Sequence, residues 1–159
     1  MTRLPTRFSR THATAPARPL PPLQASFPWS TQIGTRWEDN DNYGHVNNVK
    51  FYAFFDTAVN RFLIEQKLLK LPPAPGAPIG LVVASSCSFL SPLRFPETVA
   101  VGVRVGRLGT SSVTYELGVF AARGACAATG VFTHAYVDAS TRRPQPLPDA
   151  MRAALQRLC

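Results

Sequence analysis

Residues 39–63, DNDNYGHVNNVKFYAFFDTAVNRFL, join a polar loop to the longest helical pattern in the chain. Apolar residues in the second half recur at steps of three and one, which places them along one side of an α-helix. They are Phe51, Phe54, Phe55, Ala58, Val59, Phe62 and Leu63. The opposite side is polar, and Arg61 and Glu65 stand four residues apart, a spacing at which they can pair. We therefore expect one long helix from Asn47 to about Leu69, buried along one side.

The ten residues that lead into this helix hold two carboxylates, four asparagines, a glycine and a histidine. The first backbone N–H groups of a helix have no partner within the helix, and the helix dipole adds partial positive charge there. Asn47 or Asn48 is suited to cap this end, and Gly44 allows a conformation or a close approach that other residues would block. A carbonyl oxygen held at this point would be polarised, and Asp41 is near enough to act on the same carbonyl. The simpler alternative is that the two aspartates only brace the turn while the asparagines cap the helix.

The chain after this helix has the period of two that is typical of β-strands. Strands are predicted near residues 30–37, within residues 79–91, and over three alternating segments, 99–105, 113–119 and 131–137. In each alternating segment we expect the side that carries the valines to be covered. The short segments RLGT and ARGA favour antiparallel hairpins between the last three strands, residues 71–78 form a proline-rich loop, and Asp149 to Leu158 can form a short final helix.

The simplest architecture that accommodates these elements is an α+β fold, in which one antiparallel sheet of about five strands wraps around one long helix. Only one face of the sheet can be covered by this helix, and the edge strands are long and apolar. We therefore expect the protein to associate with itself as a homodimer or a homotetramer.

The composition limits the other possibilities. With 159 residues, of which 45% are hydrophobic, the chain suits one domain, and it contains no apolar run near the roughly 20 residues that span a membrane. Six of the 15 prolines and no acidic residue lie in residues 1–28. We interpret residues 1–27 as a disordered tail and 28–159 as the domain; a transit peptide is the alternative, which the clustered prolines oppose.

The formal net charge is +8, but four arginines of the excess lie in the tail and the other basic residues are scattered. Binding to nucleic acid is therefore not expected, whereas a small phosphate-bearing ligand suits a moderately basic rim. The three cysteines are widely spaced and lack a C-x-x-C pattern, which indicates reduced thiols and a cytoplasmic location. The three histidines are too dispersed to suggest a metal site.

The segment RWEDNDNYGHVNNVKFYAFFDTAVNRFL resembles the signature of the 4-hydroxybenzoyl-CoA thioesterase-like family of hot-dog fold proteins, which runs D-x-D-x-x-G-H-V-N-N into an aromatic-rich helix. The matching positions are Asp39, Asp41, Gly44, His45, Val46, Asn47 and Asn48. The later segments SFLSPLRFPETVAVGVRV, LGTSSVTYEL and FTHAYVDASTRRPQPLP are similar to the family too, so that the likeness covers about residues 29–150.

This resemblance implies hydrolysis of an acyl-CoA thioester without a metal or another cofactor. It implies that Asp41 is the catalytic carboxylate, as nucleophile or as base for water, and that backbone N–H groups around Asn47 and Asn48 form the oxyanion hole. His45 is assigned to shaping the loop rather than to proton transfer, and Asp39 to forming the turn. The expected substrate-binding residues are Tyr43, Gly44, Arg107, Ser111 and Ser112.

Two other functions remain open from the sequence. A hot-dog dehydratase acting on 3-hydroxyacyl thioesters would use a catalytic histidine with an acid, and the loop before the helix lacks that context. A non-catalytic protein that binds acyl thioesters would keep the fold without turnover, and the presence of Asp41 argues against it.

Overall fold

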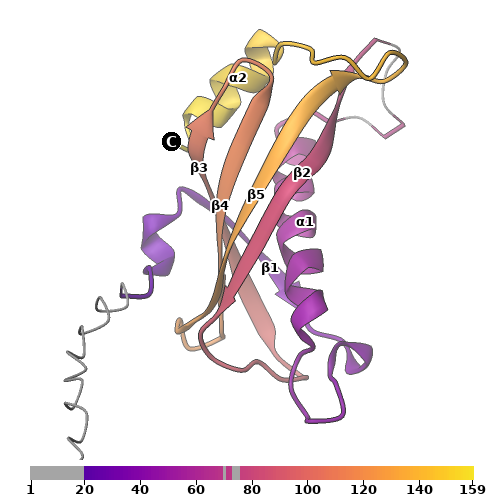
Figure 1. The fold of residues 1–159 in the computed structure, drawn as a ribbon. Helices are drawn as coiled ribbons and strands as arrows, with labels where there is room; N and C mark the ends of the chain where they lie inside the picture. The colour runs from indigo at the N-terminus through magenta and orange to yellow at the C-terminus, as the bar shows by residue number, and fades with distance from the viewer. Residues whose placement is uncertain (1–19, 70, 73–75) are drawn as a thin grey trace, which may run out of the picture.

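A five-stranded antiparallel sheet curls around one long helix in the computed structural model, which describes residues 20–69, 71–72 and 76–159 (Figure 1). The strands are β1 (Trp29–Gly34), β2 (Pro78–Phe89), β3 (Thr98–Leu108), β4 (Ser112–Phe120) and β5 (Cys126–Asp138), and their order in the sheet is β1-β3-β4-β5-β2. The α-helices are α1 (Asn48–Glu65) and α2 (Asp149–Gln156), and two short 3-10 helices span Gln24–Ser26 and Trp37–Asp39. The predicted α+β architecture, including both hairpins and the short final helix, is confirmed.

Helix α1 buries the apolar side that the sequence predicts, from Phe51 to Leu63. The helix is shorter than expected, because Lys67 adopts the left-handed backbone conformation (φ 57°). The main-chain N–H groups of Leu68 and Leu69 then turn back to the carbonyl of Leu63, at 2.8 and 3.2 Å. These bonds satisfy a carbonyl at the end of the helix and stop it at Glu65.

Among the described residues, Arg61 forms no ion pair with Glu65, although their four-residue spacing allows one. The Arg61 guanidinium reaches across to β1, where it donates hydrogen bonds to Thr31 Oγ1 at 3.1 Å and to the Gln32 carbonyl at 2.8 Å. Arg61 therefore joins the polar side of α1 to the edge of the sheet.

In β5 the covered side is not the one that the alternation of Val131, Thr133, Ala135 and Val137 predicts. The side chains that face α1 are Phe132, His134 and Tyr136, and Val131 is 38% exposed. The register with β4 decides this, because Phe132 pairs with the buried Tyr115. Apolar residues occupy both sides of this strand, so the alternation alone does not decide which side is covered.

The N-terminal segment covers part of the outer sheet face, opposite α1. Phe27 is buried against Gly102 and Gly118, and its ring meets that of Phe120 edge to face at 5.6 Å. A methyl group on Gly102 would lie 2.6 Å from the Phe27 ring, so the glycines make room for it. Phe27 thus packs on the sheet, although residues 1–27 are expected from the sequence to form a disordered tail.

The second helix, α2, lies beside the end of β3, where the Val105 N–H donates to the Leu158 carbonyl at 2.8 Å. No helix among the described residues has the length and apolar character needed to cross a membrane. Part of the loop predicted for residues 71–78 lies outside the described residues, and Pro78 begins β2.

Candidate active site

The loop that leads into α1 is anchored by Asp39, which is 1% exposed. Its carboxylate accepts hydrogen bonds from the Arg36 N–H at 2.7 Å and the Arg36 guanidinium at 3.1 Å, and it lies 3.3 Å from Lys50 Nζ. Burial opposes ionisation, but these donors outweigh it and hold the pKa of Asp39 below its ordinary value. Asp39 is therefore a buried anchor between the loop and the first turn of α1.

The segment between β2 and β3 braces the same loop from the other side. The Val46 N–H donates to the Leu93 carbonyl at 2.8 Å, and the Phe95 N–H donates to Asn40 Oδ1 at 3.1 Å. A third contact joins Arg94 to Nε2 of His45 at 3.1 Å. The loop is thus held at three points by residues about 50 positions further along the chain.

Asp41 lies at the centre of this loop, in a tight turn. Its Oδ1 accepts from the Tyr43 N–H at 2.8 Å and more weakly from the His45 N–H at 3.4 Å, while its own N–H donates to the His45 carbonyl at 2.8 Å. Gly44 permits the turn through its positive φ of 78°; a methyl group there would meet nothing within 4 Å, so the conformation rather than the space requires glycine. Among the described residues, no hydrogen bond is made to Oδ2 of Asp41.

The start of α1 lies beside this turn. Asn47 is the N-cap: its Oδ1 accepts from the Val49 N–H at 3.1 Å, and its own N–H donates to the Asp39 carbonyl at 2.8 Å. Asn48 follows as the first residue of the helix. Within the described part of the chain, its main-chain N–H has no hydrogen-bond acceptor, as is usual for the first turn of a helix.

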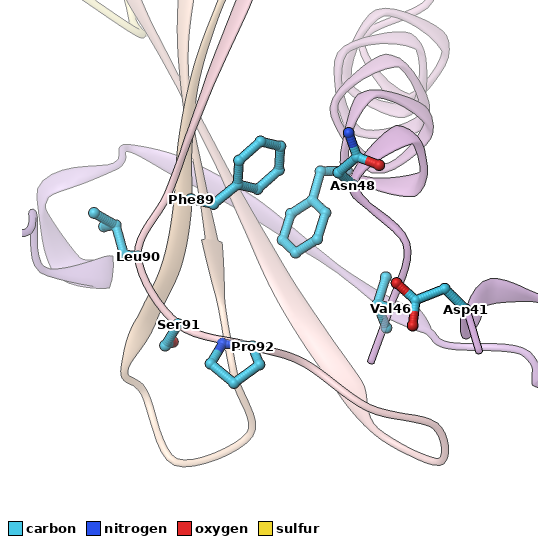
Figure 2. A pocket seen from close by; sticks show the side chains of 8 residues that line it. Asp41, Val46, Asn48, Phe89, Leu90, Ser91 and Pro92 are labelled. Carbon is cyan, nitrogen blue, oxygen red and sulfur yellow. The ribbon is translucent and has the colours of Figure 1, made fainter. Parts of the chain in front are cut away.

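Asp41 and Asn48 line one pocket of about 480 Å³. Figure 2 shows Asp41, Val46 and Asn48 on one side and the end of β2 with the residues after it on the other. The remaining lining residues are Phe51, Phe89, Leu90, Ser91 and Pro92. A carboxylate and a helix N-terminus therefore share a pocket whose other walls are mainly apolar, an arrangement that suits a polar reacting group on an apolar ligand.

The other predicted site residues lie at different places. Tyr43 is 86% exposed and does not line the pocket. Arg107, Ser111 and Ser112 lie in and beside the β3–β4 hairpin, at the end of the sheet away from the start of α1 (Figure 1). Within one chain, the structure does not bring these three residues to Asp41.

Sequence reasoning missed the wall of the pocket that comes from the end of β2. Phe89 and the three residues after it carry no motif for chemistry, and they are about 40 positions away from the loop. The proximity of the segments SFLSPLRF and DNDNYGHVNN follows only from the sheet.

An antiparallel sheet of five strands wrapped around one long helix is the hot-dog fold. The chain belongs to the thioesterase-like superfamily, whose profile matches residues 35–155. This confirms the resemblance to that family read from the sequence.

Individual proteins are similar to this chain over much of its length. The crystal structure of PA5185 from Pseudomonas aeruginosa strain PAO1 is similar, with 48% identity, a TM-score of 0.81, and coverage of 86% of this chain and 95% of that chain. A thioesterase from Thermus thermophilus, solved with coenzyme A and Zn, has 31% identity and a TM-score of 0.70, over 84% of this chain and 95% of that chain. YsmA of Bacillus subtilis is 23% identical over 96 residues, which are 60% of this chain and 63% of YsmA, so the match spans less than two thirds of that relative.

Proposed function

We propose that this protein hydrolyses an acyl-CoA thioester to a free acid and CoA, with Asp41 as the catalytic carboxylate. The observation that carries the proposal is the shared pocket of Asp41 and the start of α1. The coenzyme A in the Thermus thermophilus thioesterase supports a CoA thioester as the substrate class.

Asp41 can act in either of two ways. As a base, it takes a proton from water; the water oxygen attacks the thioester carbon, the C–S bond breaks, and the CoA thiolate takes up a proton. As a nucleophile, it attacks that carbon itself; the C–S bond breaks, CoA leaves as a thiolate that takes up a proton, and water then hydrolyses the anhydride formed between Asp41 and the acyl group to free acid and Asp41. The two N–H groups that bond Oδ1 hold the carboxylate in place and leave Oδ2 for either role.

Asn48 supplies the oxyanion hole in this proposal. Its main-chain N–H stands at the N-terminus of an 18-residue helix, where the partial charge favours an oxyanion on the thioester carbonyl. Asn47 caps the helix by accepting a hydrogen bond from the Val49 N–H, which holds the first turn in place. Gly44 and His45 shape the turn around Asp41, with no proton transfer assigned to His45.

Binding of CoA involves the exposed Arg107 and the half-buried Ser111 and Ser112, together with the exposed Tyr43, if two copies of the chain meet along β2. β2 is an edge strand with exposed apolar residues, among them Leu81, Val82 and Val83. Antiparallel pairing of two β2 strands about a two-fold axis sets the start of one strand against the end of the other. The β3–β4 hairpin end of one sheet then approaches the Asp41 pocket of the second copy. Such pairing gives a homodimer, and two dimers can form a homotetramer.

The location that fits this chemistry is the cytoplasm, where CoA thioesters and reduced thiols coexist; Cys87, Cys126 and Cys159 are free. The test is release of CoA thiol from short, long and aromatic acyl-CoAs, followed with a thiol reagent. Thiol release that depends on Asp41 supports the proposal. Binding of acyl-CoA without release would indicate the non-catalytic alternative, and water loss from a 3-hydroxyacyl thioester would indicate the dehydratase.

A further inference from the structure

Arg94 contacts the loop that carries Asp41, and the backbone of Arg94 is itself held in place. Its main-chain N–H donates to Glu97 Oε1 at 3.0 Å. Glu97 is itself tied to the residue that follows β1, because its N–H donates to Thr35 Oγ1 at 2.8 Å and its carbonyl accepts from the Thr35 N–H at 2.8 Å. The guanidinium of Arg94 therefore extends from an anchored backbone to Nε2 of His45, 3.1 Å away.

The chemistry of the two groups determines where the proton of His45 lies. A guanidinium has only hydrogen-bond donors and stays charged in proteins, so Nε2 of His45 must be the acceptor. An imidazole that accepts at Nε2 carries its hydrogen on Nδ1 when it is neutral. Arg94 thus selects one tautomer of His45 and occupies its basic nitrogen, which removes His45 from proton transfer.

His45 passes this constraint on to Asp41 through its backbone. The His45 carbonyl accepts the Asp41 N–H at 2.8 Å, and the His45 N–H approaches Asp41 Oδ1 at 3.4 Å. The next residue, Val46, is held to Leu93, the neighbour of Arg94. The ring and the backbone of His45 are therefore both held in place. Because the backbone of His45 is hydrogen-bonded to Asp41, the turn that carries the carboxylate is held as well.

We infer that Arg94 is a positioning residue that holds the Asp41 carboxylate in place through His45. This inference rests on the proposed thioester hydrolysis, in which a small displacement of the attacking or basic oxygen lowers the rate. It differs from the role that a rim arginine would have as a ligand for the phosphates of CoA, because loss of such a ligand raises KM and loss of a positioning residue lowers kcat.

The first test uses the full chain without substrate. NMR of protein labelled with ¹⁵N in histidine reports which ring nitrogen of His45 is protonated, and His45→Gln identifies its signals. We expect a hydrogen on Nδ1 and none on Nε2. In Arg94→Met, which keeps the length but removes the donors, the signals should show that Nε2 becomes protonated. A hydrogen on Nε2 in the unmodified protein, or signals that do not change in Arg94→Met, would overturn the inference.

The second test is kinetic. Arg94→Met should lower kcat roughly tenfold to a hundredfold with KM nearly unchanged, and Arg94→Lys, which retains one donor group, should recover part of the loss. Arg123→Met in the exposed β4–β5 turn is the matched control and should leave kcat unchanged. In a His45→Ala background, Arg94→Met should add no further loss, because the two residues act as one unit.

The outcomes separate the inference from the function on which it rests. A raised KM at constant kcat in Arg94→Met would overturn positioning and assign Arg94 to CoA binding. Losses that add in the double variant would overturn the link through His45. Absence of thiol release by the unmodified protein over the whole acyl panel would refute the proposed function, and the inference with it, even if the NMR result showed the His45–Arg94 bond.

Discussion

Lys50 Nζ lies 3.3 Å from Oδ1 of the buried Asp39, so an ion pair joins the first turn of α1 to the loop before it. Asp39 therefore does more than form a turn, which was its expected role. The same carboxylate also binds the backbone and the guanidinium of Arg36. The buried carboxylate thus contacts two charged side chains and one backbone N–H, which has a partial positive charge. The geometry of the loop around Asp41 depends on these three contacts.

Replacing Asp39 by Asn should lower the free energy of unfolding by about 1.5–3 kcal/mol, the range for hydrogen bonds to a charged group. Because the pKa of Asp39 is lower in the folded than in the unfolded protein, its contribution is complete above about pH 3.9 and is lost as the pH falls below that value. Urea unfolding at pH 7 and at pH 3 measures both effects. A variant as stable as the parent at pH 7 would contradict the role of Asp39 as an anchor.

His134 should make stability depend on pH in a higher window. Its ring is 4% exposed, and among the described residues Nε2 has no hydrogen-bond partner. Burial lowers the pKa of His134, with Asp56 partly opposing the shift. His134 therefore binds a proton at a higher pH in the unfolded chain than in the folded one. Its contribution to the free energy of unfolding is complete above about pH 6.5 and decreases as the pH falls below that value.

The measurement is the free energy of unfolding between pH 7.5 and pH 5. In His134→Phe, which suits the surrounding rings of Tyr115, Phe132 and Tyr136, the decrease should be smaller than in the parent. Equal slopes for the two proteins would show that His134 does not titrate in this way.

Local patterns were enough to predict α1, its N-cap and the two hairpins. The period of α1 is set by residues within a few positions of one another, and the capping bond from Val49 to Asn47 spans two residues. The covered side of β5 could not be read in this way, because apolar residues occupy both sides of the strand. There the pairing of Phe132 with Tyr115 decides, and that contact joins two strands.

The same limit applies to the site. Asp41, Gly44 and Asn48 belong to one motif and were found from the sequence, and the structure brings Asp41 and Asn48 to one pocket. Arg94 and the residues at the end of β2 reach the motif only through the fold. Arg107 and the two hairpin serines were assigned by resemblance, and their part in binding remains a prediction because they lie at the other end of the sheet.

The N-terminal segment should stabilise the domain through Phe27 alone. Phe27→Ala should lower the free energy of unfolding by about 3 kcal/mol, at the lower end of the range for a buried phenylalanine, because the ring fills the space over Gly102 and Gly118. Removal of residues 1–24 should change the thermal transition little, since none of residues 20–24 is buried. Leu23→Ala, at a position 74% exposed, is the control in differential scanning calorimetry. A large loss on truncation would show that the tail itself is structural.

The β2 edge should carry self-association. Light scattering at micromolar concentration should give at least twice the 17.3 kDa mass of one chain. Val83→Lys places a charge at a 60% exposed position of this edge and should shift the protein towards the monomer. Thr141→Lys, on the exposed turn after β5, adds the same charge elsewhere and should leave the mass unchanged. A monomeric parent would refute the proposed assembly.

Asp41→Asn should reduce thioester hydrolysis by at least about a hundredfold, the lower range for loss of a general base. The amide keeps the size of the side chain, and its oxygen can still accept the bond from the Tyr43 N–H, so the turn should survive. It lacks both the negative charge of a nucleophile and the basicity that water activation needs, so either mechanism predicts the loss. Asp149→Asn at the exposed start of α2 makes the same chemical change far from the pocket and should retain full activity.

Two measurements distinguish a catalytic role from a structural one. Thiol release from acyl-CoA gives kcat, and calorimetric binding of a non-hydrolysable acyl-CoA analogue shows whether the pocket is intact. We expect Asp41→Asn to bind the analogue nearly as well as the parent, because Asn48 and the apolar walls of the pocket are unchanged. Turnover equal to that of the parent would refute the assignment of Asp41. Loss of binding and of the thermal transition together would instead show that the carboxylate supports the loop rather than the reaction.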